Sequence, residues 1–137
     1  SGNLSLQFAD GARTIHGIEQ NRRAIGVAHS NVEKNGLQGC HYVAGDAVGH
    51  LWKNAKARNH FDCVIIDPGR AGLNQAAPPL GCLRPQSIVH LCASPEVLAR
   101  DIGALVRQGY LIKRLIGLES FPQTFQVETL TLLESVD

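Results

Sequence analysis

The stretch that decides the fold of this chain lies at residues 88–101 and reads IVHLCASPEVLARD. Its apolar start predicts a buried strand over residues 87–91. Ser94 is a favourable N-cap, the proline after it suits the first position of a helix, and a helix is predicted over residues 95–108 with Gly109 as its C-terminal stop. The stretch is therefore a strand that turns directly into a helix, which is the repeating unit of α/β sheets.

The rest of the chain alternates strands and helices in the same way. Short apolar runs predict strands, and apolar residues three and four positions apart predict helices. Strands are expected at residues 14–19, 41–44, 61–67, 87–91, 110–118 and 127–136, and helices at 21–35, 47–57 and 95–108. Pro78-Pro79 is expected to break a further helical stretch. This order predicts an α/β fold with a mostly parallel sheet and an antiparallel hairpin at the C-terminal end.

A few side chains are assigned by the same patterns. Trp52 and Phe61 are expected in the core, and Cys63 is expected to act as a small core residue inside an apolar strand. The six histidines, His90 among them, show no metal-ligand spacing and are expected at the surface or at the edge of the core.

The composition is that of one well-cored domain over residues 1–137. Hydrophobic residues make up 44% and charged residues 18% of the 137 positions, which excludes a disordered chain. The formal net charge is +1, whereas an autonomous nucleic-acid binder usually carries a strong basic excess. If RNA is a partner, this domain alone is expected to hold it weakly.

The cysteines favour a reducing, cytoplasmic location. There are four of them, and none forms a Cys-x-x-Cys pair, so no metal site is predicted. No signal peptide is recognised, and no apolar run approaches the length of about 18 residues that would indicate a membrane span.

Three acids, Glu19, Asp46 and Asp67, each end a predicted strand. In open α/β sheets, ligands bind beyond the carboxyl ends of the strands, so these carboxylates are expected at one edge. A carboxylate in such a place can accept both ribose hydroxyls of a nucleoside cofactor. The alternative is that each acid only caps the helix that follows it.

The segment at residues 67–72 reads DPGRAG and follows a predicted strand. Its proline fixes φ and ends the strand, and its glycines let the backbone approach a flat ligand. Asp67 can orient a base or balance a positive charge, and Arg70 can hold a phosphate. The alternative is an ordinary strand-to-loop turn.

Three segments of the chain resemble the RNA 5-methyluridine methyltransferases. The family reads Ser-Cys-Asn-Pro where residues 92–95 read CASP, Asp-Pro-Pro-Arg or Asp-Pro-Ala-Arg at residues 67–70, and Phe-Pro-x-Thr-x-His-x-Glu at residues 121–128. The resemblance extends over residues 2–136 and covers the catalytic domain of the family. It implies the Rossmann-like S-adenosylmethionine methyltransferase fold, with its mostly parallel sheet and C-terminal antiparallel hairpin.

The same resemblance implies S-adenosylmethionine as the cofactor. Glu19 matches the acid that holds the ribose, and Asp46 matches the acid near the adenine. Gly2 and Asn3 match the end of the glycine-rich loop that approaches the methionine part. Asp67 is expected both to border the cofactor and to orient the target base.

The catalytic residues of the family are only partly present. Glu128 matches the base that removes the proton from carbon 5 of the target uracil, while Gln126 replaces the usual histidine. Ala93 stands where the family has its nucleophilic cysteine, whose thiolate adds to carbon 6 of the uracil.

Cys92 is the only cysteine near the position of the missing nucleophile. It could serve as the nucleophile only if the turn were shifted by one residue. Neighbouring side chains at a strand end point in roughly opposite directions, so Cys92 is expected to face the core. Ser94 is a weaker candidate, because its alcohol needs an activating base and none is evident.

The first strand of the family's fold would precede Gly2. That strand lies in the middle of the sheet, so the strands at 14–19 and 61–67 are expected to lack their shared neighbour. Either residues were removed from a longer protein, or another chain fills the gap, and a homo-oligomer that completes the sheet is expected.

Two functions follow, and a third is weaker. The first is a truncated or catalytically impaired RNA (uracil-5-)methyltransferase-like domain. The second is a methyltransferase-fold remnant that acts as an oligomerising or binding module. The third keeps the methyl transfer but changes the acceptor to an amine or oxygen, for which the Asn-Pro-Pro-Tyr type of motif is absent.

Overall fold

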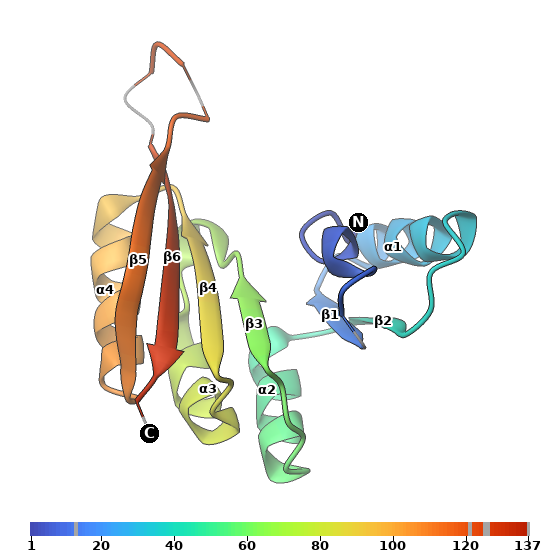
Figure 1. Cartoon of the computed structure of the whole chain (residues 1–137), viewed down its shortest axis with the longest axis horizontal. Helices are drawn as coiled ribbons and strands as arrows, with labels where there is room; N and C mark the ends of the chain where they lie inside the picture. Colours follow the sequence, from blue (N-terminus) through green and yellow to red (C-terminus); the bar gives the residue numbers. More distant parts are fainter. Residues whose placement is uncertain (13, 121, 125–126, 137) are drawn as a thin grey trace. The chain divides into compact units, whose positions relative to one another are not determined.

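The computed structural model describes residues 1–12, 14–120, 122–124 and 127–136. The chain divides into two compact units, Ser1–His50 and Leu51–Asp137, and each has a sheet of its own (Figure 1). Parallel strand pairs occur in both sheets and antiparallel pairs in the second. The predicted α/β class with its C-terminal antiparallel hairpin is confirmed.

The first unit consists of two parallel strands and the helix that connects them. Its elements are a 3-10 turn (Leu6–Phe8), β1 (Ile15–Glu19), α1 (Arg22–Lys34) and β2 (Cys40–Ala44), and α2 (Ala47–Lys56) follows them in sequence. α1 begins where it does because the Asn21 side chain accepts the backbone N–H groups of Arg23 and Ala24. Its buried face packs against the two strands, and the buried residues of this small core are Ile15, Ile25, Ala28 and Tyr42.

The second unit is built on a four-stranded mixed sheet. Its elements are β3 (Cys63–Ile66), two 3-10 turns (Gly69–Ala71 and Asn74–Ala76), α3 (Ala77–Leu83), β4 (Ser87–Cys92), α4 (Pro95–Val106), β5 (Tyr110–Leu118) and β6 (Glu128–Ser135). The strand order is β3-β4-β6-β5, with β3 and β4 parallel and the other pairs antiparallel.

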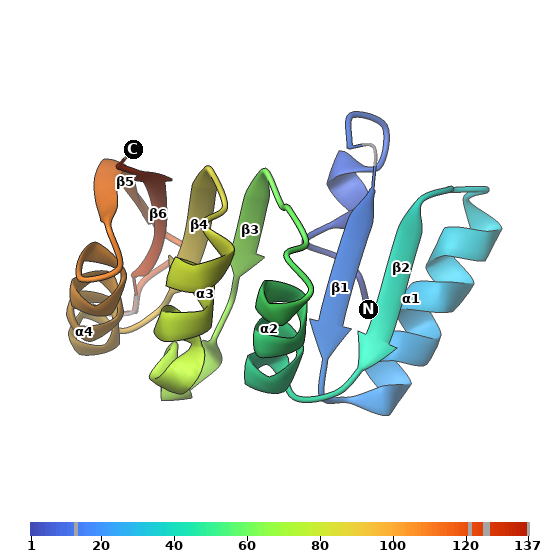
Figure 2. The same cartoon turned by 90° about the horizontal axis from the view of Figure 1, so that it is seen from below.

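The core of the second unit lies on one face of this sheet. Side chains of β4 alternate between buried and half-buried, and α3 and α4 lie on the same side of the sheet in Figure 2. Leu80 from α3, Leu105 from α4 and Ile88 from β4 are all 0% exposed. Each such side chain stabilises the unit by roughly 1.5–3 kcal/mol relative to an exposed one.

Tyr110 joins β5 to the loop before β4. It is 1% exposed, and its hydroxyl donates a hydrogen bond to the backbone oxygen of Pro85 over 3.1 Å. Burial raises the pKa of Tyr110 to about 12 although the nearby Arg84 acts in the opposite direction. The phenol therefore stays protonated and can donate its hydrogen bond at neutral pH.

Two strands, β1 and β3, form the ends of their sheets. Among the described residues, each of them pairs with a strand on one side only. This agrees with the expectation that these two strands lack a common neighbour. Parallel strands are usually buried in the middle of a sheet, so two exposed parallel edges are unusual.

Four of the sequence predictions need correction. Pro78 and Pro79 do not break a helix but lie in the first turn of α3, where a proline removes no hydrogen bond of the helix. Trp52 is 38% exposed, and α2, the helix that carries it, has no buried residue at all. Cys63 is exposed at the free edge of β3, whereas His90 is 0% exposed because it points to the covered face of β4.

Candidate functional site

The carboxyl ends of β1 and β2 bring Glu19 and Asp46 to one edge of the first unit. Both side chains are exposed. The Glu19 carboxylate accepts the backbone N–H of Asn21 over 2.9 Å, and the Asp46 carboxylate accepts that of Gly49 over 2.7 Å. Each acid thus contacts the start of the helix that follows its strand, which is the helix-capping role left open by the sequence.

Capping does not exclude a ligand at this edge. A hollow of about 280 Å³ opens between the two strand ends, and it is lined by Gln20, Arg22, Ala44, Gly45 and Asp46. Its lining includes one acid, Asp46, and one base, Arg22. Exposed carboxylates beside a hollow at the carboxyl end of parallel strands suit a ligand that carries vicinal hydroxyls.

Gly2 and Asn3 belong to a turn that packs on β2. The oxygen of Gly2 accepts the backbone N–H groups of Ser5 and Leu6, and φ at Gly2 is +80°. The Ser5 hydroxyl lies 2.7 Å from the Tyr42 hydroxyl. A Cβ on Gly2 would come within 3.2 Å of that Tyr42 oxygen, so the turn needs glycine to lie this close to the strand.

The segment Asp67–Gly72 follows β3 in the second unit and contains a 3-10 turn, Gly69–Ala71. Asp67 and Arg70 are exposed. Gly72 has φ +74° and ψ −172°, a conformation that only glycine adopts readily. A Cβ on Gly72 would overlap Arg100 Nη2 and lie 2.8 Å from Asp101 Oδ1, so the backbone is pressed against two side chains of α4.

Those two side chains of α4 fix the segment in place. Asp101 accepts the backbone N–H of Leu73 over 2.8 Å, and Arg100 donates to the backbone oxygen of Ala71 over 2.6 Å. Asp101 is 1% exposed and also lies 3.1 Å from the imidazole of His90. The sequence analysis missed these residues.

One signal in the sequence would have revealed Asp101. It shares the buried face of α4 with Ile102 and Leu105, where a charged residue is out of place unless it has partners. His90 gives a similar signal, because it takes a core position between Ile88 and Cys92 on a strand with alternating burial.

The turn after β4 separates Cys92 from its neighbour Ala93. Cys92 is 6% exposed, and its thiol donates to the backbone oxygen of Ser94 over 3.2 Å, so the prediction that it faces the core is confirmed. Ala93 is exposed. The Ser94 hydroxyl lies 3.5 Å from the backbone N–H of Val97, as its predicted N-cap role requires, and donates to Glu96 over 3.1 Å.

Glu128 is the first residue of β6, the strand that pairs with β4. The last residue pair in register is Cys92 with Thr129, and the Thr129 hydroxyl donates to the Cys92 oxygen over 3.0 Å. Ala93 follows Cys92 just beyond the end of β4, and Glu128 precedes Thr129 as the first residue of β6. The alanine and the acid therefore lie at the same end of this strand pair. Glu128 accepts the Ser120 hydroxyl over 2.6 Å, while Gln126 lies outside the described residues.

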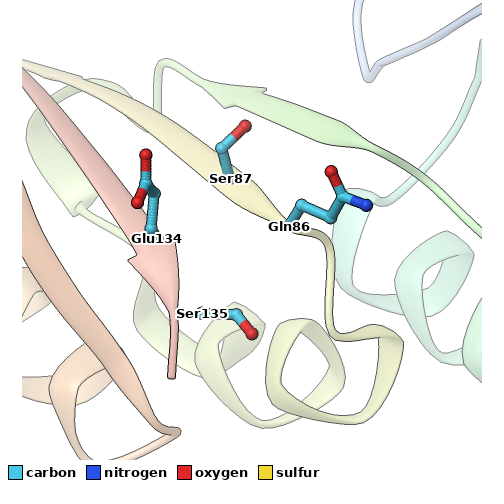
Figure 3. Close-up of a pocket in the computed structure, with 4 residues that line it drawn as sticks. All are labelled: Gln86, Ser87, Glu134 and Ser135. Carbon is cyan, nitrogen blue, oxygen red and sulfur yellow. The ribbon is translucent and has the colours of Figure 1, made fainter. Parts of the chain in front are cut away.

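A second hollow lies at the other end of the four-stranded sheet. It measures about 320 Å³ and is lined by Gln86, Ser87, Glu134 and Ser135 (Figure 3). These residues lie at the amino end of β4 and the carboxyl end of β6, away from Cys92 and Glu128. This hollow therefore takes no part in the candidate site.

The described residues contain no group of three or more histidine, cysteine or acidic side chains that could hold a metal ion. In the same part of the chain, no helix has both the length and the apolar character needed to cross a membrane. All four cysteines carry free thiols.

Solved structures with a similar fold include methyltransferases. An rRNA methylase from Streptococcus thermophilus superposes with a TM-score of 0.73 at 11% identity, over 99% of this chain and 81% of that one. TrmK of M. capricolum, solved with S-adenosyl-homocysteine, gives a TM-score of 0.69 at 16% identity, over 96% of this chain and 57% of that one. The fold is the Rossmann-like fold of S-adenosylmethionine-dependent methyltransferases.

Curated relatives specify the resemblance further, although no protein-family model matches the chain. The 23S rRNA (uracil(1939)-C(5))-methyltransferase RlmD of Aeromonas salmonicida is 34% identical over 137 residues, or 97% of this chain, and that of Pseudomonas aeruginosa is 34% identical over 134 residues, or 98%. The chain is thus homologous to a segment of the RNA 5-methyluridine methyltransferases, as the sequence motifs indicated. It spans 30% of the length of these relatives.

Gly72→Ala is expected to destabilise the second unit by about 2 kcal/mol or more, because the new Cβ meets Arg100 and Asp101 and φ is positive. Gly69→Ala is the matched control. Its φ is +61°, but a Cβ there meets open space, so only the backbone cost of about 1 kcal/mol applies. Urea unfolding of both variants measures the difference, and equal losses would contradict the close contact at Gly72.

Proposed function

We propose that this chain is the catalytic-domain part of an S-adenosylmethionine-dependent RNA (uracil-5-)methyltransferase-like protein. We further propose that its methyl transfer is impaired because Ala93 carries no thiol. One observation carries the proposal. Ala93 and Glu128 directly follow and precede the last pair of the β4–β6 register, Cys92 with Thr129, so the residues that match the family's nucleophile and base lie at the same end of this strand pair.

The cofactor would bind through residues of the first unit. In this proposal the exposed Glu19 carboxylate accepts the ribose hydroxyls, Asp46 borders the adenine, and Gly2 and Asn3 approach the methionine part. The hollow between the ends of β1 and β2 supports this fit, since it is lined by Asp46 and by Gln20, the residue that follows Glu19. When bound, S-adenosylmethionine supplies an electrophilic methyl group.

The residues of the second unit would hold and deprotonate the uracil. Asp67 orients the base, and Glu128 removes the proton from carbon 5. Glu128 is half-buried and already accepts one hydroxyl hydrogen bond, from Ser120, so its carboxylate is held in a defined position. A general base of this kind accelerates proton transfer by about 10²–10⁴-fold.

The residue that would activate the uracil, a cysteine nucleophile, is missing. Carbon 5 becomes nucleophilic only when a thiolate has added to carbon 6. The thiol of Cys92 is buried and donates to Ser94, so it reaches the ligand side of the edge only if the turn rearranges. We therefore assign Cys92 a structural role. We propose that the chain binds its ligands more readily than it transfers a methyl group.

RNA is the proposed partner, in the cytoplasm, by homology with relatives named for 23S rRNA. The net charge of +1 supplies little phosphate attraction, so the affinity of this chain alone for RNA should be low.

Glu19→Ala is expected to weaken S-adenosylmethionine binding at least about tenfold, because a carboxylate that accepts hydroxyl hydrogen bonds contributes roughly 1.5–3 kcal/mol. Glu33→Ala is the control, since Glu33 is an exposed acid near the other end of α1. Calorimetric titration of the cofactor into both variants measures the effect. No heat of binding at millimolar cofactor with the unaltered chain would refute the cofactor site.

Ala93→Cys is expected to create or raise methylation of uridine in RNA by about 100-fold or more, because it places a thiol at the position that matches the family's nucleophile, at the same end of the strand pair as Glu128. Ala93→Ser is the matched control, since its alcohol has no activating base and should add nothing. Transfer of a labelled methyl group to RNA is the measurement. If Ala93→Cys binds the cofactor with unchanged affinity and RNA binding is intact, but no methyl group is transferred, then position 93 is not the nucleophile position.

A second function is favoured by β1 and β3, each of which pairs with a strand on one side only among the described residues. We propose that a strand from another copy pairs with one of them, so that the chain also acts as an oligomerising module. Sedimentation equilibrium over a range of concentrations should then give a mass of twice the 14.8 kDa chain or more. A monomer at the highest soluble concentration would remove this proposal.

A further inference from the structure

Three polar side chains are buried together in the second unit and have no role in the chemistry proposed above. His90 in β4 and Thr131 in β6 are 0% exposed, and Asp101 in α4 is 1% exposed. Burial of an ionised carboxylate costs several kcal/mol unless it is compensated by hydrogen bonds. The partners of Asp101 therefore decide what this cluster does.

Asp101 uses both oxygens of its carboxylate. Its Oδ2 accepts the backbone N–H of Leu73 over 2.8 Å and lies 3.1 Å from His90 Nε2. Its Oδ1 accepts the Nε and Nη2 groups of Arg100 over 3.3 Å and 3.4 Å. The Arg100 side chain is 57% exposed, so the guanidinium that binds Oδ1 is itself in contact with solvent.

The carboxylate dictates the protonation of His90. An ionised carboxylate accepts hydrogen bonds and donates none, so Nε2 of His90 has to carry a proton. In the neutral imidazole, Nδ1 is then an acceptor. Within the part of the chain that the structure describes, Nδ1 of His90 and the hydroxyl of Thr131 are both buried and both lack a hydrogen-bond partner.

These two groups are complementary neighbours. His90 and Thr131 lie opposite one another in the register of β4 and β6, and their side chains share the covered face of the sheet. A hydroxyl donor beside an imidazole acceptor allows a direct hydrogen bond or one bridge through a single water molecule.

The order hydroxyl, imidazole and carboxylate is also that of a hydrolase triad. That function is excluded because no member is more than 1% exposed, so no substrate reaches the hydroxyl. The cluster acts instead through the groups that the Asp101 carboxylate holds in place, which are the Leu73 backbone N–H and the Arg100 guanidinium.

We propose that the buried side chains of Thr131, His90 and Asp101, together with the partly exposed Arg100, form a relay that positions the segment Asp67–Leu73. The relay fixes the tautomer of His90, His90 orients Asp101, and Asp101 with Arg100 holds the backbone at Leu73 and Ala71. The consequence for ligand binding rests on the proposed function, since Asp67 lies at the start of this segment. His90 is then a positioning residue, which contacts neither cofactor nor base.

The first test is the imidazole of His90 in the full chain without ligand. Nitrogen-15 NMR should show the proton of the neutral ring on Nε2 and not on Nδ1. Thr131→Val should change the Nδ1 resonance and leave Nε2 protonated. A neutral ring with its proton on Nδ1 would overturn the relay.

The second test uses a pair of substitutions at His90. His90→Phe removes the Nε2–H donor. The rate of hydrogen exchange at the Leu73 amide should then rise at least about tenfold, which corresponds to a loss of roughly 1.4 kcal/mol in the free energy of local opening. His90→Gln keeps an N–H donor at a similar distance and should restore protection at Leu73. The amide of Leu133, in the neighbouring sheet ladder, should exchange at the same rate in the unaltered chain and in both variants.

Unchanged exchange at Leu73 in a folded His90→Phe variant would overturn the proposal, as would failure of His90→Gln to restore it. If His90→Phe does not fold, the tautomer of the unaltered chain still decides the question. Neither measurement needs a ligand, so both results are valid whether or not the chain binds S-adenosylmethionine. Where it does bind, His90→Phe should weaken the affinity at least about tenfold and His90→Gln should restore it.

Discussion

The second unit depends on the buried carboxylate of Asp101. It gathers donors from α4, from β4 and from the segment after β3, and these are elements that the chain visits far apart in sequence. A buried charge with good partners costs little, but the same charge with one partner removed is strongly destabilising. Asp101 thus couples the sheet to the segment that carries Asp67.

The register of β4 and β6 determines the chemical character of the candidate site. Cys92 and Thr129 are the last pair in this register, so Ala93 and Glu128, the next residue on each side, lie at the same end of the strand pair. In the proposed function Glu128 is the base at this end, and the neighbouring nucleophile position holds an alanine that cannot take part in covalent catalysis.

Much of the fold could be predicted because the elements are marked locally. Asn21 and Ser94 cap helices as their residue types require, and the apolar runs of β4, β5 and β6 lie within a residue or two of their predicted ranges. Three of the four predictions that failed, for Trp52, Cys63 and His90, concern surroundings, and only the helix break expected at Pro78-Pro79 concerns local conformation. Trp52 and Cys63 were assigned to the core by their apolar neighbours, yet exposure depends on what covers a strand or helix from elsewhere in the chain.

The sequence by itself determined the α/β class, the acids at the strand ends and the absence of a cysteine at position 93, because each is a matter of residue type at a local spacing. The tertiary structure alone decided which backbone oxygen the Cys92 thiol binds and that Ala93 and Glu128 lie at the same end of the β4–β6 pair. It also joined His90 to Asp101, 11 residues apart, and Asp101 to Leu73, 28 residues apart. Such contacts form only when several elements pack on one sheet face, and no local periodicity encodes them.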